Sequence, residues 1–282
     1  MQQNRRVWIV GPIAWDTVIY LDQLPASGGF QQSKLVIERP GGTAANAAIA
    51  LASSGIETGF AGYLGDDARS KELQKVLDES QIAHQKIVNL EGASSHVIIF
   101  VENSGERTVL GFSEDRLDQV SITEVSLTKD DVVVFVLWRE HFRDSLNYAK
   151  AHGCITVLGA EALLDDTLTA DFVIGSGNQI ITDDMKKRFG NIILTMGEQG
   201  VRAITQDSEI FTPAIPSKVV DATGAGDSFL AGFLKGLLDH EFDLEKGLET
   251  GVHWGAMAVE RRESMPPSWN EVILKYPYLQ RT

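Results

Sequence analysis

The 282-residue chain has one cysteine, Cys154, so it cannot form an intrachain disulfide, which suits a reducing compartment. Cys154 opens the apolar run Cys154–Leu158, a setting that favours a buried core thiol over a nucleophile. Proline is also scarce at 8 residues, whereas glycine is plentiful at 26. This balance is typical of a compact fold with many tight turns rather than of a disordered chain.

Long hydrophobic runs are absent as well. The apolar stretch Val7–Val10 follows two arginines, but Gly11 and Pro12 interrupt it too early for a signal peptide. The longest other run, Val132–Trp138, is far shorter than the ~20 residues that a membrane helix needs. Excess positive charge is also lacking: the net charge is −14, whereas nucleic-acid binding requires basic patches. We therefore expect a cytoplasmic protein with neither membrane nor nucleic acid as a partner.

Short apolar runs alternate with longer amphipathic stretches, and this alternation predicts βαβ units and a largely parallel sheet. Parallel strands that are buried on both faces read as continuous apolar runs. The expected strands are 7–10, 58–61, 132–137, 155–158, 172–174 and 192–195. The expected helices are 43–53, 68–79, 142–152, 182–189, 227–238 and 244–260. The length suits one large α/β domain, which we assign to residues 1–282.

Two regions break this rhythm, because they alternate polar and apolar residues as strands do. They comprise 17–20 with 32–38, and 95–102 with 106–112, where Asn103-Ser104-Gly105 supplies a tight hairpin turn. We infer a small antiparallel sheet inserted into the α/β domain at approximately 17–39 and 95–112. Such an insertion is an active-site lid, a dimer surface or both, and its apolar faces predict a homodimer formed through the lid.

The most informative stretch is Asp221-Ala222-Thr223-Gly224-Ala225-Gly226-Asp227, which leads into the helix expected at 227–238. Its small residues let backbone amides point into open space at the helix N-terminus, where the dipole attracts an anion. It is neither a Walker A loop nor a dinucleotide fingerprint, since no Gly-Lys-Ser/Thr follows and Phe229 replaces the third glycine. An acid in a first helical turn is often a cap, but beside an anion site it also suits a phosphoryl-transfer base.

This stretch closely resembles the C-terminal signature of the ribokinase-like (PfkB) carbohydrate kinases. Pro40–Ala48 resembles the N-terminal signature of that family, in which a Gly-Gly pair precedes a helix bearing an Asn. Gly62–Asp67 looks like its Gly-x-x-Gly-Asp-Asp turn. With Asp16 after the first strand and Thr195–Gly200 late on, the likeness spans almost the whole chain. It implies a ribokinase-like three-layer α/β fold with a mainly parallel central sheet and a small β-sheet lid.

The resemblance also implies an activity: transfer of the γ-phosphoryl group of ATP to a hydroxymethyl group of a sugar or sugar-like molecule, with Mg²⁺ required. Asp227 would be the base, and the anion hole would be formed by Gly224, Ala225 and Gly226. The substrate-binding set would be Asp16, Gly41, Gly42 and Asn46. The ATP site would include Thr195, Gly197, Gly200 and Thr223. A monovalent cation such as K⁺ near Asp221 and Thr223 is a further implication.

Two more residues are candidates from their position. Arg139 follows the strand expected at 132–137, at the edge where α/β ligand sites form, and either reads a polar substituent of the substrate or is a solvated loop cation. His253 and its neighbour Trp254 lie on a late helix. There they either border the adenine or belong to the core.

The sequence departs from the family in its middle. The family carries an Asn-x-x-Glu segment associated with magnesium and phosphate. In the simplest register Ser176 replaces the Asn here and Gln179 replaces the Glu; substitution of the Asn by Asn178 after a small shift is the open alternative. Gly159 also stands where many members have an Asp. Loss of a carboxylate weakens an indirect hold on Mg²⁺.

Two alternatives therefore stay open beside a sugar kinase: a nucleoside kinase of the same fold, and a catalytically weakened ligand-binding or regulatory protein. A nicotinamide oxidoreductase is disfavoured, because Gly11 stands alone after the first strand where a Gly-x-Gly-x-x-Gly would be needed. Lid residues select the phosphate acceptor, and their alternating pattern does not name it.

Overall fold

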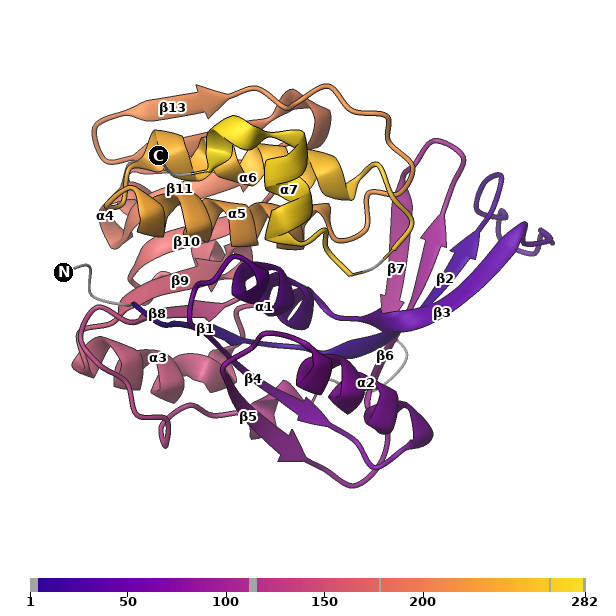
Figure 1. The fold of residues 1–282 in the computed structure, drawn as a ribbon, viewed down its shortest axis with the longest axis horizontal. Helices are drawn as coiled ribbons and strands as arrows, with labels where there is room; N and C mark the ends of the chain where they lie inside the picture. The colour runs from indigo at the N-terminus through magenta and orange to yellow at the C-terminus, as the bar shows by residue number, and fades with distance from the viewer. Residues whose placement is uncertain (1–4, 112–115, 178, 264, 281–282) are drawn as a thin grey trace.

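A nine-stranded sheet forms the centre of the computed structural model, which describes residues 5–111, 116–177, 179–263 and 265–280 (Figure 1). The strands lie in the order β13 (Glu209–Thr212), β12 (Val201–Thr205), β11 (Phe189–Thr195), β10 (Ala170–Ser176), β9 (Ile155–Gly159), β8 (Val132–Phe135), β1 (Val7–Val10), β4 (Thr58–Leu64) and β5 (His84–Asn89). From β11 to β5 all neighbours pair in parallel, whereas β12 and β13 add an antiparallel hairpin at one edge.

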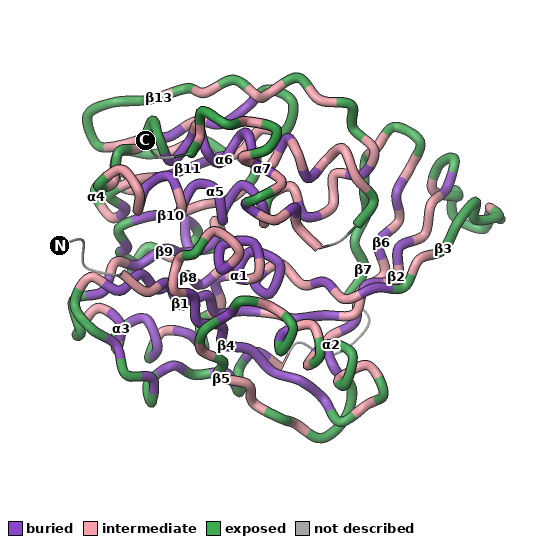
Figure 2. Tube along the Cα trace, viewed as in Figure 1, coloured by how far each residue is buried: buried purple, intermediate pink, exposed green. Residues whose placement is uncertain are grey.

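Helices cover both faces of this sheet. Strand β1 shows why: Val7 and Ile9 point into one apolar cluster, whereas Trp8 and Val10 point into another, because successive side chains alternate. The first cluster includes residues of α1 (Thr43–Ser53), α2 (Ala68–Glu79), α5 (Ala225–Asp239), α6 (Leu244–Ala258) and α7 (Trp269–Lys275). The second includes residues of α3 (Arg143–Ala151) and packs against α4 (Asp183–Arg188). The central strands are accordingly buried along their length, and the expected three-layer α/β fold is confirmed (Figure 2).

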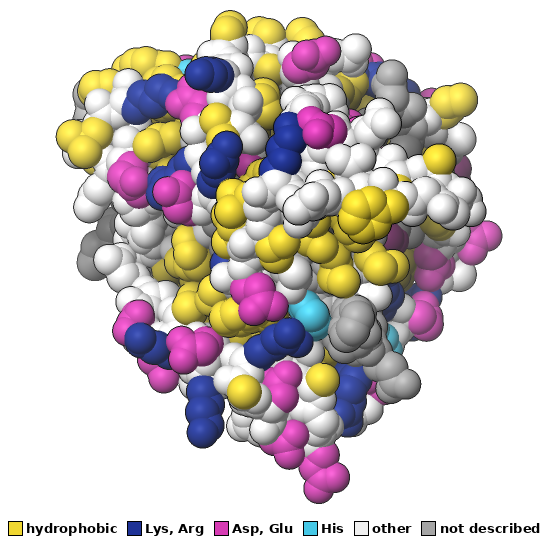
Figure 3. Space-filling model, turned by 90° about the vertical axis from the view of Figure 1, so that its right-hand side faces the viewer, with side chains coloured by type: hydrophobic (Ala, Val, Ile, Leu, Met, Phe, Trp, Pro, Cys, Tyr) yellow, Lys and Arg dark blue, Asp and Glu magenta, His cyan; other side chains and the backbone are white. Residues whose placement is uncertain are grey.

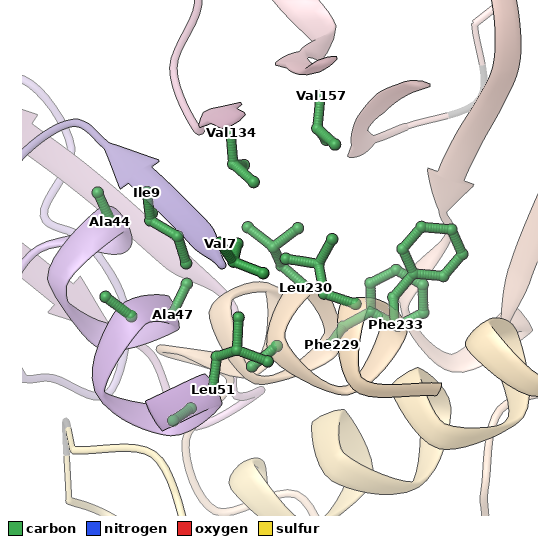
Figure 4. Packing of buried hydrophobic residues seen from close by; sticks show 14 of the residues in the cluster. Val7, Ile9, Ala44, Ala47, Leu51, Val134, Val157, Phe229, Leu230 and Phe233 are labelled. Atoms are coloured by element: carbon green, nitrogen blue, oxygen red, sulfur yellow. The ribbon is translucent and has the colours of Figure 1, made fainter. Parts of the chain in front are cut away.

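Helix α1 is built for close packing on the sheet and on α5. Its inward residues are small, as with Ala44 and Ala47, and alanine is also the best helix former. Figure 4 shows both alanines and Leu51 directed toward Ile9 and the α5 helix. Because α1 lies this close to α5, the N-terminal ends of the two helices come near one another.

A second, four-stranded sheet has the order β3 (Leu35–Gly41), β2 (Ala14–Tyr20), β6 (Ser95–Val101) and β7 (Arg107–Gly111). It projects from one side of the molecule (Figure 1). The pairs β2–β3 and β6–β7 are antiparallel, but β2–β6 is parallel, so the expectation of a purely antiparallel sheet is wrong. The cause is topological: the chain enters the sheet along both β2 and β6 and turns back along β3 and β7.

Most expected elements are present with shifted ends. The helices at 43–53 and 68–79 match α1 and α2, whereas β8 ends at Phe135 and Phe189 begins β11 rather than ending a helix. Helix α5 begins at Ala225, two residues earlier than expected. Among the strands and α-helices of the described residues, four were not expected: β5, β12, β13 and α7. Phe112, the expected end of the lid hairpin, lies outside the described residues.

Among the helices that the structure describes, none combines the length and apolar character needed to cross a membrane.

Candidate active site

Asp227 lies in the first turn of α5 and faces the start of α1. Its Oδ2 accepts a hydrogen bond of 2.9 Å from Nδ2 of Asn46. Gly224 caps α5 with a φ of 78°, a left-handed conformation that glycine adopts without strain. The first amides of a helix have no partner within it, so the turn presents the amides of Gly226 and Asp227 beside the carboxylate, whereas the amide of Ala225 donates to the carbonyl of Ala222 at 3.3 Å. A carboxylate and backbone amide donors thus lie together at one helix end.

Asp16, on β2, lies beside the start of α1 and near Asp227. Its side chain is buried, and a Cβ on Gly41 would stand 2.1 Å from its Oδ2. Gly42 has a φ of 100°, and a Cβ there would stand 2.7 Å from backbone atoms of Ile13 and Ala14. The glycine pair is therefore required by the close approach of β2 to the start of α1. It leaves Asp16 next to the glycines in space, as the sequence motif predicts.

Burial shapes the acidity of both carboxyl groups. Burial raises the pKa of Asp227 to about 6, although the hydrogen bond from Asn46 and the charge of Arg107 act in the opposite direction. The pKa of Asp16 is raised to about 7, mainly by burial. The positive charge of Arg39 opposes this shift, whereas the negative charges of Asp227 and Asp221 add to it. Asp227 is therefore ionised near neutral pH and able to accept a proton.

The buried polar atoms that lack a hydrogen-bond partner among the described residues include Oδ1 of Asn46, Oγ1 of Thr223 and Oγ of Ser228, the residue after Asp227. Buried polar groups are nearly always paired, so each such atom needs an explanation. A ligand with hydroxyl or phosphate groups at this helix end would give hydrogen-bond partners to the oxygens of Asn46 and Thr223. This observation supports Asn46 and Thr223 as binding residues.

The carboxylate of Asp221 is buried and already has several partners. Its Oδ1 accepts the backbone N–H of Thr223 at 2.8 Å, and its Oδ2 accepts the hydroxyl of Tyr20 at 2.8 Å and lies 3.5 Å from Nη2 of Arg39. Arg107 donates to the carbonyl of Ala222 at 2.8 Å. The lid strands β2, β3 and β7 therefore all contact the loop that leads into α5.

Sequence reasoning did not assign Tyr20, Arg39 or Arg107 to the site. A signal for Tyr20 was present, because the period of two along β2 places it on the same face as Asp16. Arg39 lies opposite Asp16 in the β2–β3 register, next to the Pro40-Gly41-Gly42 motif. That register was not readable before the sheet was known.

Thr195 ends β11, and its Oγ1 donates to the carbonyl of Gly175 at 3.2 Å. Gly197 opens the short helical turn that follows, and Gly200 leads from it into β12. Ser176 ends β10 directly opposite Thr195, and Gln179 is exposed nearby in the chain, whereas Asn178 lies outside the described residues. The neutral segment that departs from the family thus lies beside the predicted ATP site.

Metal-binding clusters are not apparent at this edge. In the ranges that the structure describes, three or more His, Cys, Asp or Glu side chains nowhere gather as ligands would.

The hydrogen bonds of Arg139 and His253 that the structure describes are made with residues other than Asp16, Asn46, Asp221 and Asp227. Arg139 follows β8 and donates to the carbonyl of Trp138 at 2.9 Å. His253 is buried in α6, with Nδ1 2.6 Å from the carbonyl of Glu249 and Nε2 2.5 Å from the hydroxyl of Tyr278. Both ring nitrogens of His253 are engaged within the chain, and its place beside the adenine stays a prediction.

Known proteins share this sequence and fold. The chain matches the family described as pfkB family carbohydrate kinase over residues 5–136 and 179–271. A fructokinase of Klebsiella pneumoniae is 27% identical and aligns over 84% of this chain and 86% of its own. An ATP-dependent ribose-1-phosphate kinase of Halopiger xanaduensis is 24% identical, over 91% of this chain and 92% of its own.

Solved structures show the same fold. A ribokinase of Giardia lamblia superposes with a TM-score of 0.80 at 19% identity, over 96% of this chain and 99% of that one. A nucleoside kinase of Burkholderia thailandensis, solved with inosine, gives 0.79 at 18% identity, over 97% and 98%.

The chain therefore belongs to the pfkB family of carbohydrate kinases. The unmatched interval, 137–178, contains Gly159 and Ser176, two of the departures from the family pattern.

Proposed function

We propose that this kinase moves the γ-phosphoryl group of ATP to a hydroxymethyl group of a sugar or sugar-like small molecule. The observation that carries the proposal is Asp227, ionised near neutral pH at the glycine-rich start of α5 and held by Asn46. Phosphoryl transfer depends mainly on positioning and charge stabilisation, and this helix end offers both.

In this reaction Asp227 accepts the proton of the attacking hydroxyl. The amides of Gly224, Ala225 and Gly226 stabilise the charge on the migrating group, aided by the helix dipole. Asp16 and Asn46 orient the sugar by hydrogen bonds to its hydroxyls, while Gly41 and Gly42 bring the backbone close to it. These roles account for the unpartnered oxygen of Asn46.

ATP lies, in this proposal, along Thr195, Gly197 and Gly200, with Thr223 near the phosphates and His253 toward the adenine. Mg²⁺ enters with the nucleotide, because it usually keeps several waters and binds through substrate phosphates. Its charge lowers the repulsion between the phosphates and the carboxylates. Ser176 and Gln179 offer only neutral oxygens here, so the chain itself contributes little to holding the ion. Arg139 contacts a polar substituent of the acceptor.

We also propose that residues 1–282 work as a single kinase unit in the cytoplasm. Segments at approximately 17–39 and 95–112 serve as its lid. In support, β2, β3, β6 and β7 form a sheet of their own, and Tyr20 and Arg107 reach from it to the catalytic loop.

The decisive experiment is a panel of sugars and nucleosides assayed for ADP release. We expect turnover with a sugar, and Asp227→Asn should lower kcat by about 10²–10⁴-fold, the usual contribution of a general base. Asp239→Asn, at the other end of the same helix, is the matched control and should leave the rate unchanged.

Other outcomes decide between the alternatives. Turnover confined to nucleosides would establish the nucleoside kinase instead. Ligand binding without turnover would establish a weakened, regulatory protein. A rate that Asp227→Asn leaves intact would refute the catalytic assignment.

A further inference from the structure

Arg39 is a buried cation at the point where the lid meets the catalytic loop. Its side chain is 9% exposed, and β3 places it opposite Asp16. Its Nη1 donates to the carbonyl oxygen of Arg262, and its Nη2 lies 3.5 Å from Oδ2 of Asp221. Nε and Nη2 of Arg39 have no hydrogen-bond partner among the described residues, so the pairing with Asp221 is electrostatic. A buried charge requires such a partner, and this arginine therefore serves the structure around it.

The two groups that Arg39 joins belong to adjoining segments. Asp221 precedes the Gly224–Gly226 turn, and Arg262 follows α6. The amides of Val220 and Asp221 donate to the carbonyl of Val259 at 2.7 and 3.2 Å, so these segments run side by side. The guanidinium of Arg39 therefore contacts both the Asp221 segment and the Arg262 segment. These contacts fix the Gly224–Gly226 turn, which presents its amides to the phosphoryl group.

A bound monovalent cation does not fit this arrangement. Both carboxylate oxygens of Asp221 already accept hydrogen bonds, from Thr223 and from Tyr20, and a guanidinium lies beside the second. Any K⁺ coordinated there would be repelled by the fixed charge of Arg39 a few ångströms away. The expectation of a K⁺ site at Asp221 and Thr223 therefore disagrees with the residues present.

We propose that Arg39 is the built-in cation of this active site: it neutralises Asp221, ties the lid to the catalytic loop, and makes phosphoryl transfer independent of K⁺ or Na⁺. The proposal rests on the kinase function proposed above. Arg39 is a positioning residue, because it acts through Asp221 and the Gly224–Gly226 turn rather than on the reacting atoms.

The first test varies the salt. Initial rates of the wild-type protein are measured in potassium, sodium and tetramethylammonium chloride at equal ionic strength. We expect rates within about twofold of one another, since general screening is the same in all three. Activation of the wild-type enzyme by K⁺ of about tenfold or more over tetramethylammonium, a factor too large for screening, would overturn the proposal.

The second test removes the charge. Arg39→Met should lower kcat by roughly 10–100-fold with a smaller change in KM, because the turn rather than substrate binding is disturbed. Arg39→Lys keeps a cation and should retain more activity. Arg6→Met, which removes an arginine from the pair with Asp131 before the starts of β1 and β8, is the control. A change confined to the KM of the sugar would instead make Arg39 a substrate ligand and refute the positioning role.

A third readout needs no turnover. The thermal midpoint of Arg39→Ala should rise in potassium relative to tetramethylammonium chloride, because the vacated space beside Asp221 then admits an ion, whereas the wild-type midpoint should not respond. Partial rescue of Arg39→Ala by added guanidinium would support the same assignment. An equal response of both proteins to potassium would contradict it. This readout stands even if the kinase assay fails, so the two proposals fail separately.

Discussion

Asp16 is buried and Asp227 is half-buried, and desolvation raises the pKa of both carboxyl groups, yet the proposed function gives them different tasks. Asp227 stands at a helix N-terminus and its pKa is about 6, so it is ionised at the pH where kinases work. The pKa of Asp16 is about 7, so Asp16 is half protonated near neutrality and hydrogen-bonds to hydroxyls either as donor or as acceptor. The charges of Asp221 and Asp227 contribute to this upward shift of Asp16.

The pH dependence of kcat should report Asp227. Since the base must be ionised, kcat should be constant at high pH and should fall about tenfold per pH unit below the pKa that Asp227 has in the substrate complex; in the free protein that pKa is about 6. Saturating sugar keeps the binding groups occupied while kcat is measured. A kcat that stays constant down to about pH 4.5, below the pKa range of the proposed base, would contradict the role of Asp227.

Asp16→Asn should stabilise the protein while it weakens substrate binding. Because the folded-state pKa of Asp16 is raised, its protonated form favours the fold, and that stability is lost as pH rises from about 4 to about 7. Asparagine stays neutral, so the free energy of unfolding should increase by up to roughly 4 kcal/mol at about pH 8, the equivalent of the pKa shift.

Urea denaturation at about pH 8 and at about pH 5 measures this effect, and the gain should shrink at the lower pH because wild-type Asp16 is then protonated. Asp118→Asn, at an exposed position, is the control and should change little. An equal or larger gain at the lower pH would show that charge burial is not the cause.

At the scale of elements, the start of α1 depends on close backbone packing, because Gly42 lies against the backbone that leads into β2. Gly42→Ala should cost roughly 2–4 kcal/mol, because alanine is strained at a φ of 100° and its Cβ would meet backbone atoms at 2.7 Å. Gly55→Ala is the matched control: its φ is 81° but nothing stands within 4 Å of a Cβ there, so it should lose only about 1 kcal/mol. Equal losses of unfolding free energy for the two variants would remove the steric argument.

The same helix shows how much the sequence alone could predict. The run Thr43–Ser53 has strong helix formers and a clear start at the glycine pair, so its ends match the structure. Strand β5 (His84–Asn89) was missed because it is an edge strand with polar residues and no continuous apolar run. Strands β12 and β13 were missed for a related reason, since their pairing is antiparallel and local at the opposite edge.

The residues of the candidate site likewise fall into those that the sequence could predict and those that it could not. Asp16, Asn46 and Asp227 stand in recognisable motifs, and the structure gathers them at one helix end. Arg39 and Tyr20 depend on strand register and on a contact across about two hundred residues of chain with Asp221, which no local pattern encodes. Motifs therefore located the proposed site residues, whereas the residues that contact them across the fold could be found only from the structure.

At the scale of the whole molecule, the outer face of the lid sheet remains apolar. The register places Val36, Ile19 and Phe100 in one row and Ile98 and Leu110 in the next, which also contains Glu38 and Thr17, on the face turned away from Asp221. Val36 is 50% exposed and Leu110 is 53% exposed. Figure 3 views the molecule from the side of this sheet and shows hydrophobic side chains gathered near the middle, with charged side chains interspersed around them.

We propose that this lid face binds the same face of a second copy to form a homodimer. A sheet face of this kind is self-complementary about a twofold axis, and isologous pairing of identical patches is the commonest route to soluble dimers. An apolar centre with a charged rim is also the usual anatomy of an interface. Pairing would fix the strands that carry Tyr20, Arg39 and Arg107, so assembly and catalysis would be coupled.

Light scattering should therefore give the wild-type protein twice the chain mass of 30.9 kDa, and the double variant Val36→Glu/Leu110→Glu should give the single mass. Leu274→Glu, on α7 and 81% exposed, is the matched control and should remain dimeric. Because the lid contacts the catalytic loop through Tyr20, Arg39 and Arg107, the monomeric variant should also show a raised KM for the sugar. A wild-type protein that is monomeric at every concentration would contradict the dimer. In that case only the contacts of Tyr20, Arg39 and Arg107 would hold the lid against the loop before α5.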